Sequence, residues 1–113
     1  PYAKDMYLFG LMNMAMLLRE KGNYGDARAY LIKAMNKPTD DIETKSNVLF
    51  EFSYLEYLIQ NYRNSSSLAE KAIVLKTQIN SVENFAQAFT ILVYGKSMMG
   101  ELVGGENALV KAL

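Results

Sequence analysis

The fold follows from one segment, residues 11–38 with the sequence LMNMAMLLREKGNYGDARAYLIKAMNKP, because its pattern predicts two helices joined by a tight turn. From Tyr7 to Leu18 the chain is apolar almost all round, which is typical of a helix packed between neighbours. Gly22 suits the left-handed position just past the end of this helix. Asn23 can cap the second helix, which we expect to end at Pro38.

The same signals predict a second pair of helices. Asp40, with Glu43 three residues later, resembles a capping box and predicts a helix that runs to about Asn61. A short break at residues 62–64 then leads into a fourth helix. Because short connections force consecutive helices to be antiparallel, we expect these two helices to pack against each other.

A third pair is expected in the last third of the chain. Asn80 or Ser81 can cap a fifth helix that reaches Met99. Gly104-Gly105 precede a sixth helix, which runs to Leu113. The sequence therefore predicts a single all-α domain made of three antiparallel αα-hairpins, over about residues 3–38, 40–78 and 80–113.

Internal similarity supports this division. Asn23-Tyr24 and Ala34 recur 38 residues later as Asn61-Tyr62 and Ala72. The first hairpin carries a recognisable pattern of small, large and turn residues: Leu11, Met14, Ala15, Leu18, Gly22, Tyr24, Ala27, Leu31, Ala34 and Pro38. This pattern resembles the tetratricopeptide repeat family, in the longer-helix variant found in bacterial regulatory and peptide-sensing proteins. The resemblance implies a right-handed superhelix in which the first helix of each hairpin lines a concave groove.

The later repeats depart from the family pattern. Glu56 occupies a position where a large apolar residue is expected, and Val93 and Lys96 do not fit the third repeat. Gly95 offers a small residue for close helix packing nearby.

Composition excludes several classes of function. Twelve basic residues balance twelve acidic ones, which argues against nucleic-acid binding because phosphate contacts need a basic surface. The chain has no histidine and no cysteine, so we expect no metal site, no cofactor and no catalysis. Since no apolar run is long enough to span a membrane, we expect no membrane insertion. The start at Pro1 resembles neither a signal peptide nor an initiator, which suggests a piece of a longer protein, and we favour a cytoplasmic over a secreted location.

Two local motifs could suggest chemistry but have simpler explanations. Asp40, Asp41 and Glu43 form a tight carboxylate cluster, and capping of a helix start explains it. Gly104-Gly105 precede a helix without the strand or the lysine of a phosphate-binding loop, so a hairpin turn is the preferred interpretation.

The predicted groove combines aromatic, amide and hydroxyl side chains. We assume that the first hairpin is packed by Leu11, Met14, Ala15 and Leu18, which leaves a neighbouring stripe for the groove. The residues expected to bind a partner are Met12, Met16, Arg19, Asn47, Phe50, Tyr54, Tyr57, Gln87, Thr90 and Tyr94, with Phe9 and Ser97 on the same stripes. Arg19 is the cation available for a carboxylate. In the alternative interpretation Phe50, Tyr54 and Tyr57 pack against the neighbouring hairpin, and Met12 and Met16 fill the core.

Two functions are consistent with these features. The first is a non-catalytic scaffold or sensor module that binds a protein or peptide. The second is self-assembly into a homo-oligomer, through an uncovered last helix with Leu109, Val110 and Leu113 on its surface.

Overall fold

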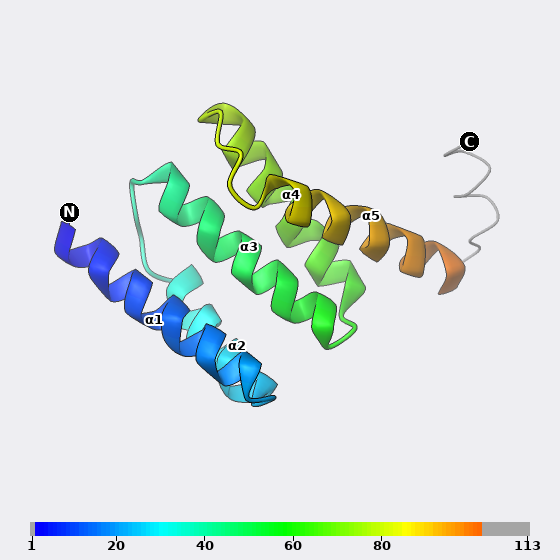
Figure 1. The fold of residues 1–113 in the computed structure, drawn as a ribbon, viewed down its shortest axis with the longest axis horizontal. Helices are drawn as coiled ribbons and strands as arrows, with labels where there is room; N and C mark the ends of the chain where they lie inside the picture. The colour runs from blue at the N-terminus through cyan, green and yellow to red at the C-terminus, as the bar shows by residue number, and fades with distance from the viewer. Residues whose placement is uncertain (1, 103–113) are drawn as a thin grey trace.

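The protein is all-helical over the part of the chain that the structure describes. A computed structural model describes the backbone of residues 2–102 and the side chains of residues 6–100. Residues 2–102 contain no strand and form five helices (Figure 1): α1 Tyr2–Glu20, α2 Tyr24–Met35, α3 Ile42–Leu58, α4 Tyr62–Gln78 and α5 Phe85–Leu102. The all-α prediction is confirmed for this range, and the sixth helix expected after Gly104-Gly105 lies outside the described residues.

The helices form two layers. Figure 1 shows α1, α3 and α5 running in the same direction, with α2 and α4 behind them. Contacts are most extensive between α1 and α2, between α3 and α4, and between α4 and α5. Because α1 and α5 both also contact α3, α3 is the central helix of its layer.

Three of the helices, α1, α3 and α4, end in the same type of turn. In each, the residue after the C-cap adopts a left-handed backbone, with φ of 82° at Gly22, 67° at Gln60 and 53° at Asn80. The amide of the next residue then donates to the carbonyl five residues earlier, which is the hydrogen bond of a Schellman motif. These three bonds are Asn23 to Leu18 at 2.8 Å, Asn61 to Glu56 at 2.8 Å and Ser81 to Lys76 at 2.9 Å. The expected role of Gly22 is confirmed.

This turn corrects several predicted helix boundaries. The fourth helix begins at Tyr62 without the expected break, because Asn61 both closes the turn and precedes the new helix. Asn80 and Ser81 complete the turn after α4, so the fifth helix begins only at Phe85. The helix then continues through Gly100 to Leu102, beyond its predicted end at Met99.

The start of α3 is also different from the prediction. Asp41, not Asp40, is the N-cap residue, and its side chain makes no capping bond to the backbone. Its Oδ2 instead accepts a hydrogen bond from the Thr44 hydroxyl at 2.6 Å. The cluster of carboxylates therefore borders a helix start, as expected, but not through a capping box.

The apolar core surrounds α3 and leaves one side of α1 open. The buried stripe of α1 consists of Leu8, Leu11, Met12 and Ala15. Met14 was expected in the core, but it is exposed because it lies on the other side of the helix from this stripe. The expectation that α1 is enclosed by neighbours is wrong for the described residues, since Met6, Tyr7, Met14 and Leu17 are exposed.

A buried carboxylate links the first two pairs of helices. Glu56, on α3, has no exposed surface. Its Oε1 accepts a bond of 2.6 Å from Arg28 Nε, on α2, and its Oε2 accepts one of 2.7 Å from Asn61 Nδ2. A charged group is tolerated in a core only when it is paired and hydrogen-bonded, and both oxygens of Glu56 meet that condition. This explains how an acidic residue occupies a position where an apolar one was expected.

Gly95 provides close helix packing, as expected from the sequence, and the helix that α5 approaches at this residue is α4. A Cβ atom at this position would collide with the Ser66 hydroxyl and would lie 3.3 Å from both Ser65 Oγ and the Tyr62 carbonyl oxygen. The Ser66 hydroxyl is buried and has no hydrogen-bond partner among the residues that the structure describes. Close packing of the two helices therefore depends on the missing side chain.

We predict that Arg28→Met destabilises the protein by about 2–3 kcal/mol, because it leaves the buried Glu56 carboxylate without its cation. Urea denaturation followed by circular dichroism measures the change. Arg63→Met, which removes an exposed arginine from α4, is the matched control and should shift the unfolding free energy by less than about 0.5 kcal/mol. Equal effects of the two substitutions would contradict the assigned role of Arg28.

Candidate functional site

A hollow opens on the layer formed by α1, α3 and α5. Its volume is about 500 Å³, which lies in the range of sites that bind ligands. Helix α1 contributes one residue, α3 contributes four, and the rest come from α5 and the residue before it. The lining consists of Arg19, Phe50, Glu51, Tyr54, Tyr57, Asn84, Ala86, Gln87, Thr90 and Ile91.

The charged residues of this hollow are paired with each other. Arg19 Nη1 donates to Glu51 Oε2 at 2.8 Å, which connects α1 to α3. The guanidinium carbon of Arg19 also lies 4.6 Å from the centre of the Tyr54 ring, within range of a cation–π interaction. The guanidinium is therefore held between a carboxylate and an aromatic face.

Aromatic side chains form a continuous wall along α3. Phe50 and Tyr54 stack with their ring centres 6.4 Å apart. Tyr57 makes edge-to-face contacts with Tyr62 at 5.9 Å and with Tyr94 at 6.4 Å. These contacts fix the rings, so the wall presents large apolar area without further loss of side-chain freedom on binding.

The opposite wall offers amides and a hydroxyl. The Asn84 and Gln87 side chains have no hydrogen-bond partner among the described residues. The Thr90 hydroxyl donates to the Ala86 carbonyl at 2.9 Å and retains the capacity to accept. Since an amide side chain can both donate and accept, this wall matches the hydrogen-bonding groups of a peptide backbone.

Six of the ten residues predicted to bind a partner line this hollow: Arg19, Phe50, Tyr54, Tyr57, Gln87 and Thr90. Tyr94 lies at its margin, where it contacts Tyr57. Phe50 is nevertheless buried in the core, so both interpretations given for it describe part of its position. Tyr54 and Tyr57 also pack against the core while they line the hollow.

The other three predicted residues lie elsewhere. Met12 is in the core, because it packs in the cluster formed by Leu8, Leu11, Ala34 and Val48. Met16 is half-buried and does not line the hollow. The Asn47 side chain is engaged within the protein, where its Oδ1 accepts a bond of 3.2 Å from Lys76 Nζ. The positions of Met12 and Met16 follow from the rotation of α1 about its axis, and the position of the Asn47 side chain follows from its contact with Lys76 on α4. Neither the rotation nor the contact could be predicted from helical spacing.

Lys76 is a buried lysine next to this asparagine. Burial lowers the pKa of its amino group below the ordinary value of 10.5, and the carboxylates of Glu83 and Glu43 oppose this effect only in part. Asn47 therefore has a structural role as an acceptor for a partly desolvated amine.

Sequence reasoning missed four residues of the hollow: Glu51, Asn84, Ala86 and Ile91. Glu51 was overlooked because its partner is 32 residues away on another helix. Asn84 was missed because the fifth helix was expected to begin several residues earlier. Since α5 begins at Phe85, Asn84 lies directly before its first turn, and a correct prediction of the helix start would have placed it there.

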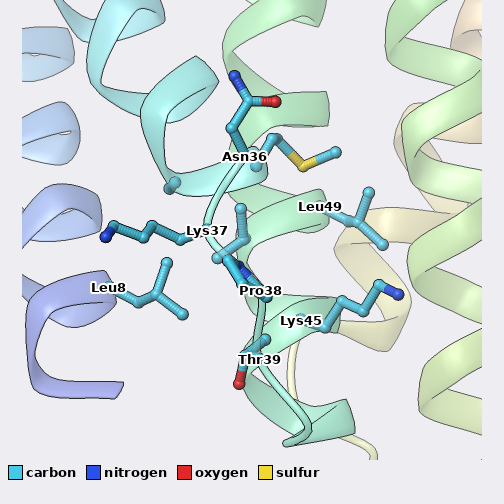
Figure 2. Close-up of a pocket in the computed structure, with 10 residues that line it drawn as sticks. Leu8, Asn36, Lys37, Pro38, Thr39, Lys45 and Leu49 are labelled. Carbon is cyan, nitrogen blue, oxygen red and sulfur yellow. The ribbon is translucent and has the colours of Figure 1, made fainter. Parts of the chain in front are cut away.

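A second hollow, of about 360 Å³, lies beneath the connection between α2 and α3. Its apolar lining consists of Leu8, Ala34, Met35, Pro38, Val48 and Leu49. Figure 2 shows the amino groups of Lys37 and Lys45 pointing away from each other on opposite sides of Pro38. Since its cations do not converge on one point, we interpret this hollow as a packing gap under a connecting segment.

Comparison with known proteins does not assign a family. No family model matches the chain, and neither a curated protein nor a solved structure does. Among residues 2–102, no helix combines the length and the apolar character needed to cross a membrane. The same part of the chain contains no group of three or more acidic side chains arranged to hold a metal ion.

The lowered pKa of Lys76 predicts a pH-dependent stability. Between that lowered pKa and 10.5 the unfolded chain binds more protons than the folded one, so the free energy of unfolding contributed by Lys76 rises with pH across this interval. Lys76→Met should remove this contribution. Urea denaturation of the wild type and of Lys76→Met, from neutral pH to pH 10.5, measures this contribution as the difference between their unfolding free energies. Ionisation of the tyrosines affects both proteins and cancels in this difference. The exposed Lys71→Met is the control, and an identical pH slope in wild type and Lys76→Met would contradict the prediction.

Proposed function

We propose that this protein binds an extended segment of another protein or a peptide in the hollow between α1, α3 and α5. The observation that carries the proposal is that six residues predicted from the repeat resemblance and from helical spacing line one concave surface: Arg19, Phe50, Tyr54, Tyr57, Gln87 and Thr90. Side chains from three helices contribute to it, so the surface exists only in the folded arrangement.

The proposal includes a tetratricopeptide-like repeat as the scaffold. It is supported by the shared turn at the ends of α1 and α3, which repeats at an interval of 38 residues in Gly22 and Gln60. It is also supported by the placement of α1, α3 and α5 in one layer, since the resemblance implies that the first helices of successive hairpins line the groove (Figure 1).

The chemistry of the hollow is suited to binding. The tyrosines of α3 offer large contact area, and the amides of Asn84 and Gln87 can pair with a peptide backbone. With no histidine or cysteine in the chain, we place the protein among binding modules and not among enzymes.

Self-assembly is a second candidate function, favoured by an apolar face on α5. Phe89 and Val93 are 52% and 50% exposed. Their counterparts in the internal repeat, Leu49 and Ser53, lie 40 residues earlier and are buried, with 4% and 0% exposure. The face of α5 that corresponds to a packing surface is therefore uncovered among the described residues, and such faces often mark interfaces. The Leu109, Val110 and Leu113 positions first considered for assembly lie outside those residues.

For the binding function we predict that Tyr54→Ala and Gln87→Ala each weaken peptide binding about tenfold, the effect of losing one anchor or one well-placed amide. The measurement is fluorescence polarisation with labelled members of a random decapeptide library, capped at both ends. Tyr54→Ala also removes packing, whereas the exposed Gln87 has no partner within the described residues, so Gln87→Ala should leave the melting temperature unchanged. Tyr24→Ala, at a tyrosine outside the hollow, is the control. Unchanged affinity in both variants would overturn this site.

For self-assembly we predict that the molar mass rises with concentration and that Phe89→Ser combined with Val93→Ser keeps the protein monomeric. Removing two half-exposed apolar side chains weakens an interface by a few kcal/mol, which is about a hundredfold in affinity. Light scattering after size exclusion measures the mass. Val82→Ser removes an exposed apolar side chain from the α4–α5 connection and is the control. A constant monomeric mass of the wild type would exclude this function for α5.

A further inference from the structure

We propose that the hollow selects an uncharged peptide segment with a large apolar side chain, and that Glu51 enforces this choice by occupying Arg19. The inference rests on the proposed function, since it specifies which peptides the same hollow accepts. It replaces the expectation that Arg19 recognises a carboxylate.

The geometry of Arg19 shows why a carboxylate is not the favoured ligand. One side of its guanidinium is engaged by Glu51 at 2.8 Å, and Tyr54 covers it at 4.6 Å. The side chains of Arg19 and Glu51 are only 15% and 14% exposed. An incoming carboxylate would have to share the cation with a carboxylate that is already in place, and like charges at close range repel.

The balance of charge in the lining leads to the same conclusion. Arg19 and Glu51 cancel, and the other eight lining residues are uncharged. A charged ligand group that enters this hollow loses water without gaining a free counter-charge, which is costly. An apolar side chain instead meets Tyr54, Tyr57 and Ile91, and burying it is favourable.

The amide wall adds the second part of the specificity. The Asn84 and Gln87 side chains are unpaired within the described residues, so they can bond to backbone groups of a peptide of any sequence. They lie on the opposite wall from the α3 aromatics. A segment in the hollow can thus direct one apolar side chain to the rings while its backbone pairs with the amides.

The test compares two substitutions that change the charge of the hollow in opposite directions. Glu51→Gln frees the Arg19 guanidinium, and Arg19→Gln leaves the Glu51 carboxylate alone. The probe is a library of decapeptides, acetylated and amidated at the ends, in which the central residue is Leu, Phe, Asp, Glu or Lys. Binding is measured by fluorescence polarisation, and circular dichroism reports the fold of each variant.

The wild type is expected to prefer peptides centred on Leu or Phe. Glu51→Gln should improve binding of the Asp and Glu peptides about tenfold, and Arg19→Gln should improve binding of the Lys peptides instead. Opposite changes of preference cannot arise from a general loss of structure. The controls are Glu70→Gln and Lys71→Gln, which remove one negative and one positive charge from α4, away from this hollow. Both should leave the peptide preference unchanged.

Three results would overturn the inference. If the wild type prefers acidic peptides, Arg19 is available despite Glu51, and the proposed function stands while the inference fails. The same holds if apolar peptides bind but neither substitution changes the preference. If no peptide binds to the wild type or to any variant, the proposed function fails and the inference fails with it.

Discussion

The arrangement of the first four helices depends on how the Glu56 carboxylate is satisfied. This side chain is completely buried on the central helix, so each of its oxygens needs a donor. One donor comes from Arg28 on α2 and the other from Asn61 in the turn before α4. An apolar side chain at this position would tolerate small displacements of its neighbours, whereas hydrogen bonds of 2.6 and 2.7 Å do not. The position of α2 relative to α3 and the path of the chain into α4 are thus set by one charged group.

A second arginine–glutamate pair joins two helices at the hollow. Arg19 joins α1 to α3 through Glu51 within one layer, whereas the Arg28–Glu56 pair joins α2 to α3 between the two layers. Two arginines of the first helix pair therefore contact two glutamates of the central helix. One pair has a fully buried carboxylate and supports the fold, while the other lines the hollow on the α1, α3 and α5 layer. The difference lies in what surrounds each pair, not in the residues themselves.

Much of this structure could be predicted from helical spacing, and the failures have specific causes. Gly22 follows the end of α1 as predicted, and α2 ends at Met35, three residues before the predicted end at Pro38, so local signals located the first hairpin closely. Gln60 and Asn80 adopt the left-handed conformation without being glycine, which displaced the predicted starts of the fourth and fifth helices. The aromatic wall of the hollow follows from the period of α3, but the Arg19–Glu51 pair does not, because nothing in the spacing of one helix reveals its partner on another.

Gly95 is the point about which a tilt of α5 relative to α4 is considered. The helix lies close to α4 at this residue, where a glycine without a side chain faces Ser65 and Ser66. Gln87 lies eight residues away on the same rigid rod, at about 12 Å. A tilt of about 5° around the glycine would therefore move Gln87 by about 1 Å, enough to open or close a hydrogen bond across the hollow. The width of the hollow is therefore sensitive to a helix contact that lies outside its lining.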